Sequence, residues 1–521
     1  MRLKYKISLA IILLLMVGCF MTYQSYALYV ANLSGSDNNL SVGCFNIEFS
    51  ESSSPISLDN TYPISDTKGL TIAPYTFTIT NKCTTDASYS VILSSLTTNG
   101  IDDNNIKYAI YETTKPTSGT LLTSATSYTD TSNLANVKNR KNSYQVATGG
   151  LKGAPEENGT GGSKTYNLIL WLDEATGNEA MSKTFSASVN VVSAGGEYTP
   201  TAVEKITELA QTDTTNLATD DYGNTRYIGA DPNNYVSIDG DIWRIIGVMK
   251  NVDDGTGNKE DRVKIIRSTS IGDYSWDTSE SSINSGYGVN EWSQADLMKL
   301  LNPGYESESV GGSLYWNNQS GTCYNNENNA TTSCNFTSTG INEKLKNMLG
   351  NTVWNTGSNG RNDYTSSSNG LTKHFYTYER STNTGKKICT PGNYCNDKVE
   401  RTTTWTGKIG LMYPSDYGYA TSGGSTTDRA TCLNTNLSSW NSSSVSDCKN
   451  NDWLFNSNFQ WTISPGADSS YASGAFLVDS DGFVDYDFAY SDFGVRPVGY
   501  LLSNTSIQSG DGSSGNPFIL S

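Results

Sequence analysis

Apolar and polar residues alternate with a period of two along the N-terminal part of the chain. The clearest stretches are short and separated by turn residues: 44–49, 75–79, 89–93, 108–111, 166–171 and 185–189. This alternation is typical of strands that bury one face and expose the other. Because several such strands follow one another at near-regular spacing, we predict a mainly β fold, with an antiparallel β-sandwich over residues 28–195.

The pattern changes after the predicted sandwich. A Gly-rich segment is followed by a short helical stripe in which Val203, Ile206, Leu209 and Ala210 share one face. These features predict a linker with a short helix over residues 196–221.

Longer apolar runs and helical stripes mark the C-terminal part. The run 243–248 predicts a strand, and the stripes around 292–301 and 341–349 predict two helices. Between 351 and 404 the chain is polar and reads as a long, loop-rich stretch. We therefore predict that residues 222–521 form an α+β domain with long loops.

The composition agrees with a folded β protein and argues against nucleic-acid binding. Apolar residues make up 36% of the chain, but they include 32 Tyr and 10 Trp, which bury large surfaces. The net charge of −17 argues against a nucleic-acid partner, because phosphates are bound through Lys and Arg.

Residues 1–27 have the three parts of an export signal. Basic residues stand near the start, an apolar run covers 7–21, and small residues occupy Ser25 and Ala27. The run is shorter than the roughly 20 residues that a spanning helix needs. We predict cleavage after Ala27 and a secreted or cell-surface protein.

Two alternatives to that cleavage stay open. The segment can remain as an uncleaved membrane anchor. Residues 16–19 also approximate a lipobox, although Met16 and Phe20 fit that motif poorly.

Eight cysteines follow the predicted leader and are interpreted as disulfide-forming in an oxidising compartment: Cys44, Cys83, Cys323, Cys334, Cys389, Cys395, Cys432 and Cys448. The last six form three close couples, each bracketing residues that allow a turn. Cys44 and Cys83 are placed to join strands of the sandwich. Zinc is the alternative, but the chain has one histidine and no Cys-x-x-Cys pair. The pairing is an inference, since eight cysteines allow many connectivities.

Catalytic motifs are scarce. His374 is the only histidine, and no Gly-x-Ser-x-Gly elbow accompanies it. We interpret His374 as a surface or loop residue and predict that the protein is not an enzyme. The chemical alternative is an extracellular glycan hydrolase that uses paired carboxylates.

An acidic run near the C-terminus is a candidate calcium site. Its carboxylates are close in sequence: Asp479, Asp481, Asp485 and Asp487. Calcium prefers several carboxylate and carbonyl oxygens, but the spacing is not that of an EF-hand loop. A β-turn with solvated carboxylates is the alternative. Apart from this calcium, we predict no cofactor.

Aromatic residues cluster in the same region. They are candidates for a ligand-binding surface: Phe483, Tyr486, Phe488, Tyr490 and Phe493. Aromatic rings suit sugars and peptides, because they offer flat apolar faces, with a polar handle in Tyr. Core packing is the alternative.

Two resemblances rest on short motifs. Tyr26-Ala27-Leu28-Tyr29, followed by a polar stretch and residues 42–47, resembles the start of camelysin/TasA-type secreted proteins of Gram-positive bacteria. The resemblance covers about the first 195 residues and implies a β-sandwich, which in some members polymerises into extracellular fibres. Cys44 and Cys83 depart from that pattern.

The second resemblance covers about residues 222–521. Its motifs are 227–236, 243–247, 461–465 and the closing 494–498. They resemble an uncharacterised domain on surface proteins of gut Gram-positive bacteria, with C-type-lectin-like and formylglycine-generating-enzyme-like character. The resemblance implies an α+β fold whose long loops present a ligand surface.

Together these observations predict a secreted or cell-surface, non-enzymatic binding or adhesion protein whose C-terminal domain displays the binding surface. The expected partners are an extracellular glycan or a host or matrix protein, with self-assembly through the N-terminal domain. The alternative functions are a structural subunit of an extracellular fibre and the glycan hydrolase.

Overall fold

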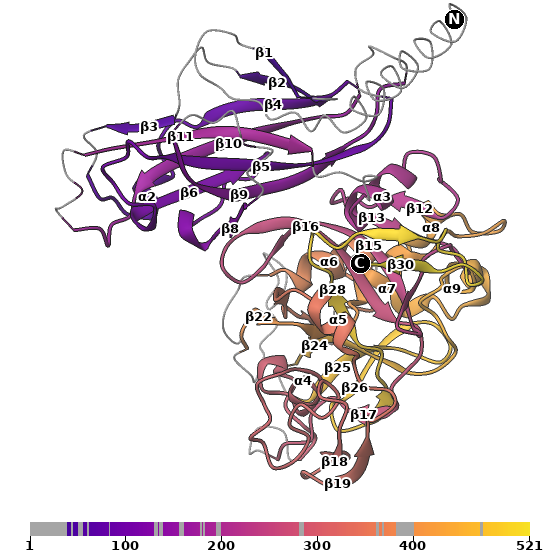
Figure 1. Cartoon of the computed structure of the whole chain (residues 1–521). Helices are drawn as coiled ribbons and strands as arrows, with labels where there is room; N and C mark the ends of the chain where they lie inside the picture. Colours follow the sequence, from indigo (N-terminus) through magenta and orange to yellow (C-terminus); the bar gives the residue numbers. More distant parts are fainter. Residues whose placement is uncertain are drawn as a thin grey trace, which may run out of the picture. The chain divides into compact units, whose positions relative to one another are not determined.

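The computed structural model divides the chain into two compact units, unit 1 (Met1–Thr199) and unit 2 (Pro200–Ser521) (Figure 1). The residues that it describes are 39–42, 45–49, 56–59, 62–82, 84–129, 134, 139–155, 161–177, 180, 183–193, 200–280, 286–360, 364–366, 369–381, 401–468 and 472–521. Leader residues 1–27 lie outside them. In the described part, no helix is both long and apolar enough to cross a membrane.

Unit 1 consists of two antiparallel sheets. The first has the strand order β1 (Asn39–Val42), β2 (Phe45–Phe49), β4 (Tyr75–Asn81), β10 (Ser163–Leu172), β6 (Ile106–Tyr111) and β7 (Thr120–Leu121). The second has the order β3 (Ile56–Asp59), β11 (Thr184–Ser193), β5 (Ala87–Leu96), β9 (Arg140–Leu151) and β8 (Thr126–Ser127). Three short helical turns accompany them: α2 (Asp66–Gly69), η1 (Asp103–Asn105) and η2 (Leu122–Ser124).

Strand β10 shows why the sequence forms these sheets. Leu168, Leu170 and Leu172 point into the main core between the sheets. Ile169 and Trp171 point to the opposite face and join a smaller buried cluster. Side chains of a strand alternate between its two faces, so an almost continuous apolar stretch forms a strand that is covered on both sides.

Unit 2 is built around a nine-stranded sheet. Its main order is β23 (Ile409–Gly410), β28 (Val498–Tyr500), β16 (Lys259–Arg267), β15 (Asp241–Asp253), β14 (Tyr235–Ile238), β30 (Phe518–Leu520) and β29 (Ile507–Ser509). β13 (Thr225–Tyr227) also pairs with β15, and β12 (Leu217–Thr219) pairs with β13. The last strands of the chain therefore lie in the same sheet as the first strands of the unit (Figure 1).

A second sheet and two hairpins complete the β structure. The sheet has the order β17 (Asp273–Ser275), β27 (Asp492–Gly494), β24 (Gln460–Ala467), β25 (Gly474–Val478) and β26 (Val484–Phe488), with β21 (Asn359–Gly360) beside β24. The hairpins are β18 (Ser320–Tyr324) with β19 (Thr331–Asn335), and β20 (Thr352–Asn355) with β22 (Thr404–Gly407).

Short helices connect these strands. They are α3 (Ala202–Leu209), η5 (Trp292–Gln294), α4 (Asp296–Leu301), α5 (Glu343–Met348), α6 (Thr372–Glu379), α7 (Pro414–Ala420), α8 (Arg429–Leu433), η6 (Leu437–Ser439), η7 (Ser443–Val445) and α9 (Ser446–Asn450). The core of unit 2 is rich in aromatic residues, and Trp243, Trp276 and Trp461 are fully buried in it.

The predicted mainly β class and the antiparallel sheets are confirmed. The C-type-lectin-like identity of the C-terminal domain stays a prediction. The helix expected near residue 203 is present as α3, but Ala202 and Ile206 pack into the core of unit 2. Unit 2 therefore begins at Pro200, and part of the predicted linker 196–221 belongs to it.

The stretch expected to be loop-rich, 351–404, contains more regular structure than predicted. The structure places β20, α6 and the start of β22 there. Helix α6 has a weak apolar pattern, because only Thr372, Phe375, Tyr378 and Glu379 are buried. Its stability comes from packing on α7 and the sheets, which a local pattern does not show.

Candidate functional site

A cavity of about 360 Å³ opens in unit 2 beside the ends of β15, β16 and β20. Lys250, Lys259 and Asn355 line it, together with Tyr376 and Arg380 from α6 and its C-terminal end. We call it the cationic cavity. Its volume falls in the range of about 300–1,000 Å³ that small-molecule sites occupy.

Positive charge dominates this cavity. Lys250 pairs with Asp261 at 2.6 Å. Lys259 is exposed, and its Nζ atom makes no hydrogen bond or ion pair with the described residues. Among the lining side chains that the structure describes, Asp253 is the only acidic one. Arg380 is also paired, with Glu379 at 2.9 Å, so the unpaired positive charge of the cavity is that of Lys259, and it favours an anionic ligand.

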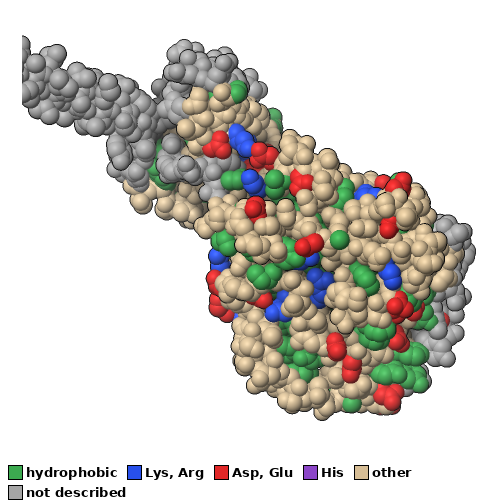
Figure 2. Space-filling model, turned by 90° about the vertical axis from the view of Figure 1, so that its right-hand side faces the viewer, with side chains coloured by type: hydrophobic (Ala, Val, Ile, Leu, Met, Phe, Trp, Pro, Cys, Tyr) green, Lys and Arg blue, Asp and Glu red, His purple; other side chains and the backbone are tan. Residues whose placement is uncertain are grey.

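Basic side chains also gather on the surface of unit 2. Figure 2 shows a group of Lys and Arg side chains near the middle of one face, with acidic side chains scattered around them and toward the edges. Apolar side chains on this face form several small groups, so the picture offers no large continuous apolar surface.

Arg380 is held in a fixed orientation at the end of α6. Its guanidinium carbon lies 3.4 Å from the centre of the Tyr376 ring. Its Nη1 atom donates to the Tyr376 carbonyl at 3.0 Å and to Glu379 Oε2 at 2.9 Å. The Nε and Nη2 atoms have no partner among the described residues, and 27% of the side chain is exposed. Arg380 therefore keeps donors free for a ligand.

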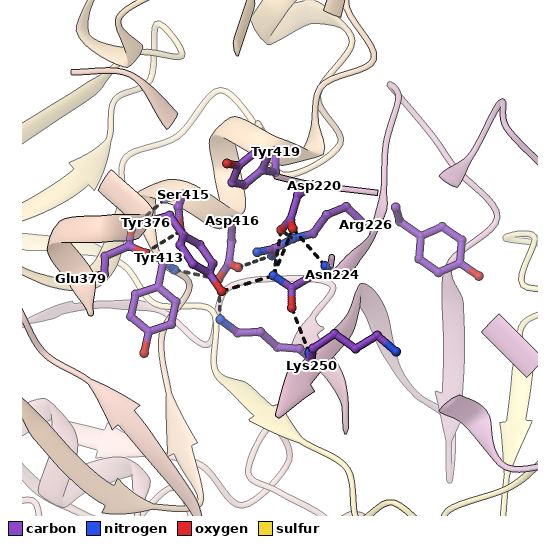
Figure 3. Close-up of polar contacts among 12 residues, drawn as sticks. Asp220, Asn224, Arg226, Lys250, Tyr376, Glu379, Tyr413, Ser415, Asp416 and Tyr419 are labelled. Carbon is purple, nitrogen blue, oxygen red and sulfur yellow. Dashed lines mark hydrogen bonds and ion pairs between the residues drawn. The ribbon is translucent and has the colours of Figure 1, made fainter. Parts of the chain in front are cut away.

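Tyr376 is itself fixed by its neighbours. The Tyr222 ring stacks on it with centroids 3.8 Å apart. Because Arg380 also stacks on this ring, the two groups occupy opposite faces. The Tyr376 hydroxyl accepts from Asn224 Nδ2 at 3.3 Å, and Asn224 Oδ1 accepts from the Lys250 backbone N–H at 2.9 Å (Figure 3). Asn224 thus links the Tyr376 side of the cavity to β15.

A buried network of charges lies behind the cavity. Arg226 donates to Asp416 Oδ1 at 2.6 Å and to Asp220 Oδ2 at 2.8 Å (Figure 3). Lys264 Nζ contacts Asp416 Oδ2 at 2.5 Å. These four side chains are at most 2% exposed. Two cations and two anions balance, so the network is neutral and joins the β12–β13 region, β16 and α7.

The network shifts the pKa values of its members. Burial lowers the pKa of Lys264 to about 8, although Asp416 acts against that shift. Burial alone would raise the pKa of Asp416, but the charges of Lys264 and Arg226 lower it to about 2. Asp416 is therefore ionised at neutral pH. The Lys264 ammonium also lies over an aromatic ring, 4.2 Å from the centre of Tyr413.

A second buried carboxylate connects the network's helix to Arg380. Glu379 is 1% exposed and accepts from the Ser415 N–H at 3.0 Å and from Ser415 Oγ at 2.5 Å. Burial raises the pKa of Glu379, and the charge of Arg380 opposes that shift. Through Glu379, α7 fixes the position of the arginine that faces the cavity.

The predicted disulfides are present where the structure describes the cysteines. Cys323 and Cys334 join β18 to β19 with Cα atoms 5.8 Å apart. Cys432 and Cys448 join α8 to α9 with Cα atoms 5.4 Å apart. Cys44, Cys83, Cys389 and Cys395 lie outside the described residues. Two disulfides indicate an oxidising compartment.

The five predicted aromatic residues differ in their ring contacts. Phe483 and Tyr486 pack against the core. Phe488 and Tyr490 both stack on Tyr287, at 4.7 and 5.4 Å.

The fifth ring, Phe493, also packs against the core. Phe493 stacks on Phe459 at 5.0 Å. None of the five predicted rings is among the lining residues of the cationic cavity that the structure describes.

The candidate calcium carboxylates make local contacts. Asp479 Oδ1 accepts from the Asp481 N–H at 2.8 Å, and the Gly482 N–H donates to the Asp479 carbonyl at 2.9 Å, which closes the predicted β-turn. Asp485 accepts from the Tyr364 hydroxyl at 2.7 Å. Burial raises the pKa of Asp487. In the described ranges, no three His, Cys, Asp or Glu side chains come together as a metal site, and the calcium site stays a prediction.

One carboxylate pair bears on the hydrolase alternative. Burial, and then the charge of Asp296, raise the pKa of Asp277 to about 6. However, Asp277 accepts from the Val289 N–H at 2.6 Å and from Ser279 Oγ at 2.5 Å. The cavity beside Asp296 has a volume of about 10 Å³, which is room for one water at most. This pair therefore gives the hydrolase alternative no support.

His374 lies on α6 and is half-buried. Burial lowers its pKa, as does the charge of Lys373. Its Nδ1 atom is buried and has no hydrogen-bond partner among the described residues.

Sequence reasoning did not find the cationic cavity. Its main residues, Tyr376 and Arg380, stand in the stretch that was expected to be a loop. One local signal was available nearby: Pro414 at the first position of α7 and Asp416 in its capping box mark a helix start. Nothing local indicates that Asp416 meets Arg226.

The sequence matches no protein-family model, and no curated protein matches it.

Proposed function

We propose that the protein is a secreted or cell-surface binding protein that holds an anionic group in the cationic cavity of unit 2. One observation carries this proposal. Two Arg380 nitrogens and the Lys259 ammonium, which have no partner among the described residues, line the same cavity. A cavity of this size takes a carboxylate or phosphate group together with part of the molecule that bears it.

Arg380 is suited to such a group. A guanidinium is planar and presents parallel N–H donors to a carboxylate or phosphate. Stacking on Tyr376 and the ion pair with Glu379 orient it before the ligand arrives. Preorganisation reduces the entropy lost on binding, so more of the interaction energy contributes to affinity.

The chemistry of the cavity supports binding rather than turnover. The guanidinium of Arg380 stays charged at neutral pH, because Glu379 raises its pKa against the effect of burial. Such a group holds an anion and does not transfer protons near neutral pH. Unit 1 serves as a scaffold in this proposal, and copies of the protein self-assemble through it.

The proposal rests on an extracellular setting. The two disulfides support an oxidising compartment, and residues 1–27 supply the export signal. An acidic glycan is the ligand class that best fits both the setting and the cavity. An anionic segment of a host or matrix protein presents the same chemistry.

Titration calorimetry on the full chain tests the proposal. The probes are glucuronate, glucose 6-phosphate and, as an uncharged match, methyl glucoside. We expect at least one anionic probe to bind with a heat that Arg380→Gln reduces, and any heat from methyl glucoside to be unaffected by Arg380→Gln. Affinity should fall as salt rises, because exposed charges are screened.

Variants locate the binding. Arg380→Gln should weaken anion binding about tenfold or more, and Lys259→Gln by a smaller factor, since Lys acts as a point charge. Lys68→Gln is the matched control, because it removes the same charge from an exposed position on α2 in unit 1. Equal effects of all three variants, or no binding of either anion, would contradict the proposal.

A further inference from the structure

A second cavity lies at the edge of the smaller sheet of unit 2. It has a volume of about 500 Å³ and opens where β17, β27 and the start of β24 meet. Phe459 and Phe493 line it, with polar residues from the loops 268–270 and 456–458. We call it the aromatic groove. It shares no described lining residue with the cationic cavity.

Two stacked rings form one side of the groove. The Phe459 and Phe493 rings lie 5.0 Å apart at 24°. They are neighbours because Gln460 pairs with Gly494 between parallel strands, and the Gly494 N–H donates to the Phe459 carbonyl.

One ring of the pair is anchored and the other is open. Phe493 also contacts Trp461 edge-on at 4.9 Å, and Trp461 is 1% exposed. Phe459 is 38% exposed. The buried Trp461 therefore supports an apolar face that stays accessible to solvent.

Polar groups with free bonding capacity surround these rings. The Asp273 carboxylate makes no hydrogen bond or ion pair with the described residues, although it lines the groove. Asn456 Oδ1 accepts from the Asn458 N–H at 3.1 Å and from Gln460 Nε2 at 2.8 Å, which fixes the loop and leaves Asn456 Nδ2 without a partner in the described part of the chain. Asn458 Nδ2 donates to the Asn456 carbonyl, and its Oδ1 atom stays free.

The second acid of the groove is already engaged. Asp492 Oδ1 accepts from Ser275 Oγ at 2.9 Å, and Asp492 Oδ2 accepts from Asn325 Nδ2 at 3.0 Å. The groove thus presents one free carboxylate, one free amide N–H₂ group and one free amide oxygen beside an exposed ring. A ligand that satisfies all of them carries both donors and acceptors next to an apolar face.

We propose that the aromatic groove binds a neutral pyranose sugar. The C–H face of the ring would stack on Phe459, and its hydroxyls would donate to Asp273 and exchange hydrogen bonds with Asn456 and Asn458. An anionic ligand is disfavoured by the carboxylates of Asp273 and Asp492. A simple cation would leave the Asn456 amide donor unused. This inference goes beyond the anion site and stands on different residues.

Saturation-transfer NMR on the full chain tests the inference. The probes are the methyl glycosides of glucose, galactose, mannose and N-acetylglucosamine, with tetramethylammonium as the cationic comparison. We expect saturable binding of at least one glycoside and strong transfer from the protein to its ring protons. Binding of tetramethylammonium alone, or of none of the probes, would overturn the inference.

Two variants assign the binding to the groove. Phe459→Ala should weaken glycoside binding by roughly three- to tenfold, the loss of one aromatic contact. Asp273→Asn keeps the shape and should weaken it about tenfold, because hydrogen bonds to a charged acceptor are the stronger ones. Tyr62→Ala is the matched control, since Tyr62 is exposed on unit 1. Equal affinity of Phe459→Ala and Tyr62→Ala would overturn the inference.

The two sites can be judged separately. Arg380→Gln should leave glycoside binding unchanged, and Phe459→Ala should leave glucuronate binding unchanged. If glucuronate binds while no glycoside does, the groove inference fails and the proposed function survives. The reverse result retires the cationic cavity and keeps the groove.

Discussion

Unit 1 and unit 2 each bury a carboxylate, but the groups that contact the two carboxylates differ. In unit 1, Asp103 Oδ2 accepts three bonds from neutral donors: Ser95 Oγ at 2.8 Å, Asn142 Nδ2 at 2.7 Å and Tyr144 Oη at 2.8 Å. In unit 2, Asp416 contacts the charged side chains of Arg226 and Lys264. In the sandwich, neutral donors hold one carboxylate oxygen, and Asp103 Oδ1 is buried without a hydrogen-bond partner among the described residues, whereas unit 2 balances full charges.

The difference follows from what each network connects. The Asp103 contacts join segments of a single sheet region, which backbone hydrogen bonds already hold together. The Asp416 contacts join α7 to the β12–β13 region and to β16. A buried ion pair leaves an uncompensated charge when one partner is removed. Unit 2 is therefore the region where a single substitution should have long-range effects.

The largest expected effect is on Asp416. Asp416→Asn keeps the shape but leaves Arg226 and Lys264 with less negative charge, so we expect a loss of about 3–5 kcal/mol in the free energy of unfolding. Urea unfolding followed by tryptophan fluorescence measures it, because Trp171 is the only one of ten tryptophans in unit 1. A loss below about 1 kcal/mol would show that the negative charge of Asp416 does not stabilise Arg226 and Lys264 in the folded protein.

The next effect is on acid stability. The folded pKa of Asp416, about 2, lies below its ordinary value of 3.8. A lowered carboxyl pKa stabilises the folded state above the unfolded pKa, and this contribution is lost as the pH falls through the folded pKa. We expect unit 2 to lose about 2 kcal/mol from this group between pH 4 and pH 2.

Comparison with the variant isolates that contribution. Urea midpoints measured across this pH range should fall more steeply for the natural chain than for Asp416→Asn. Parallel pH profiles of the two proteins would contradict the assignment to Asp416.

The smallest effect is on Asp103. Asp103→Asn retains an amide oxygen for the three neutral donors, so we expect a loss of about 1 kcal/mol or less. Hydrogen exchange in β5 and β9 measures it within unit 1. A loss as large as that of Asp416→Asn would remove the contrast between the two units.

Several features of the fold were readable from local sequence. The alternation in 75–79 and 89–93 predicts β4 and β5, because it places one apolar face toward a core. The stripe at Leu345 and Met348 predicts α5 for the same reason. The disulfides were readable because Cys432 and Cys448 stand near each other in the chain.

The candidate sites were much less readable. Phe493 was predicted to contact a ligand, but its partner Phe459 comes from the segment just before β24 and was not predicted to contact one. Arg380 depends on Tyr376 one turn earlier, and also on Glu379, which is fixed by Ser415 from another helix. Local patterns report which face of a strand or helix is buried, and they do not report which segments meet.

The sequence by itself determined the mainly β class, the oxidising chemistry of the described cysteine couples and the acidic charge, because each follows from residue type and short-range spacing. Only the tertiary structure decided that a chain of net charge −17 brings Lys250, Lys259 and Arg380 to one cavity and a free carboxylate beside the exposed Phe459 ring in another. The physical reason is that both cavities are assembled from segments far apart in the chain, whose pairing depends on the packing of the whole unit.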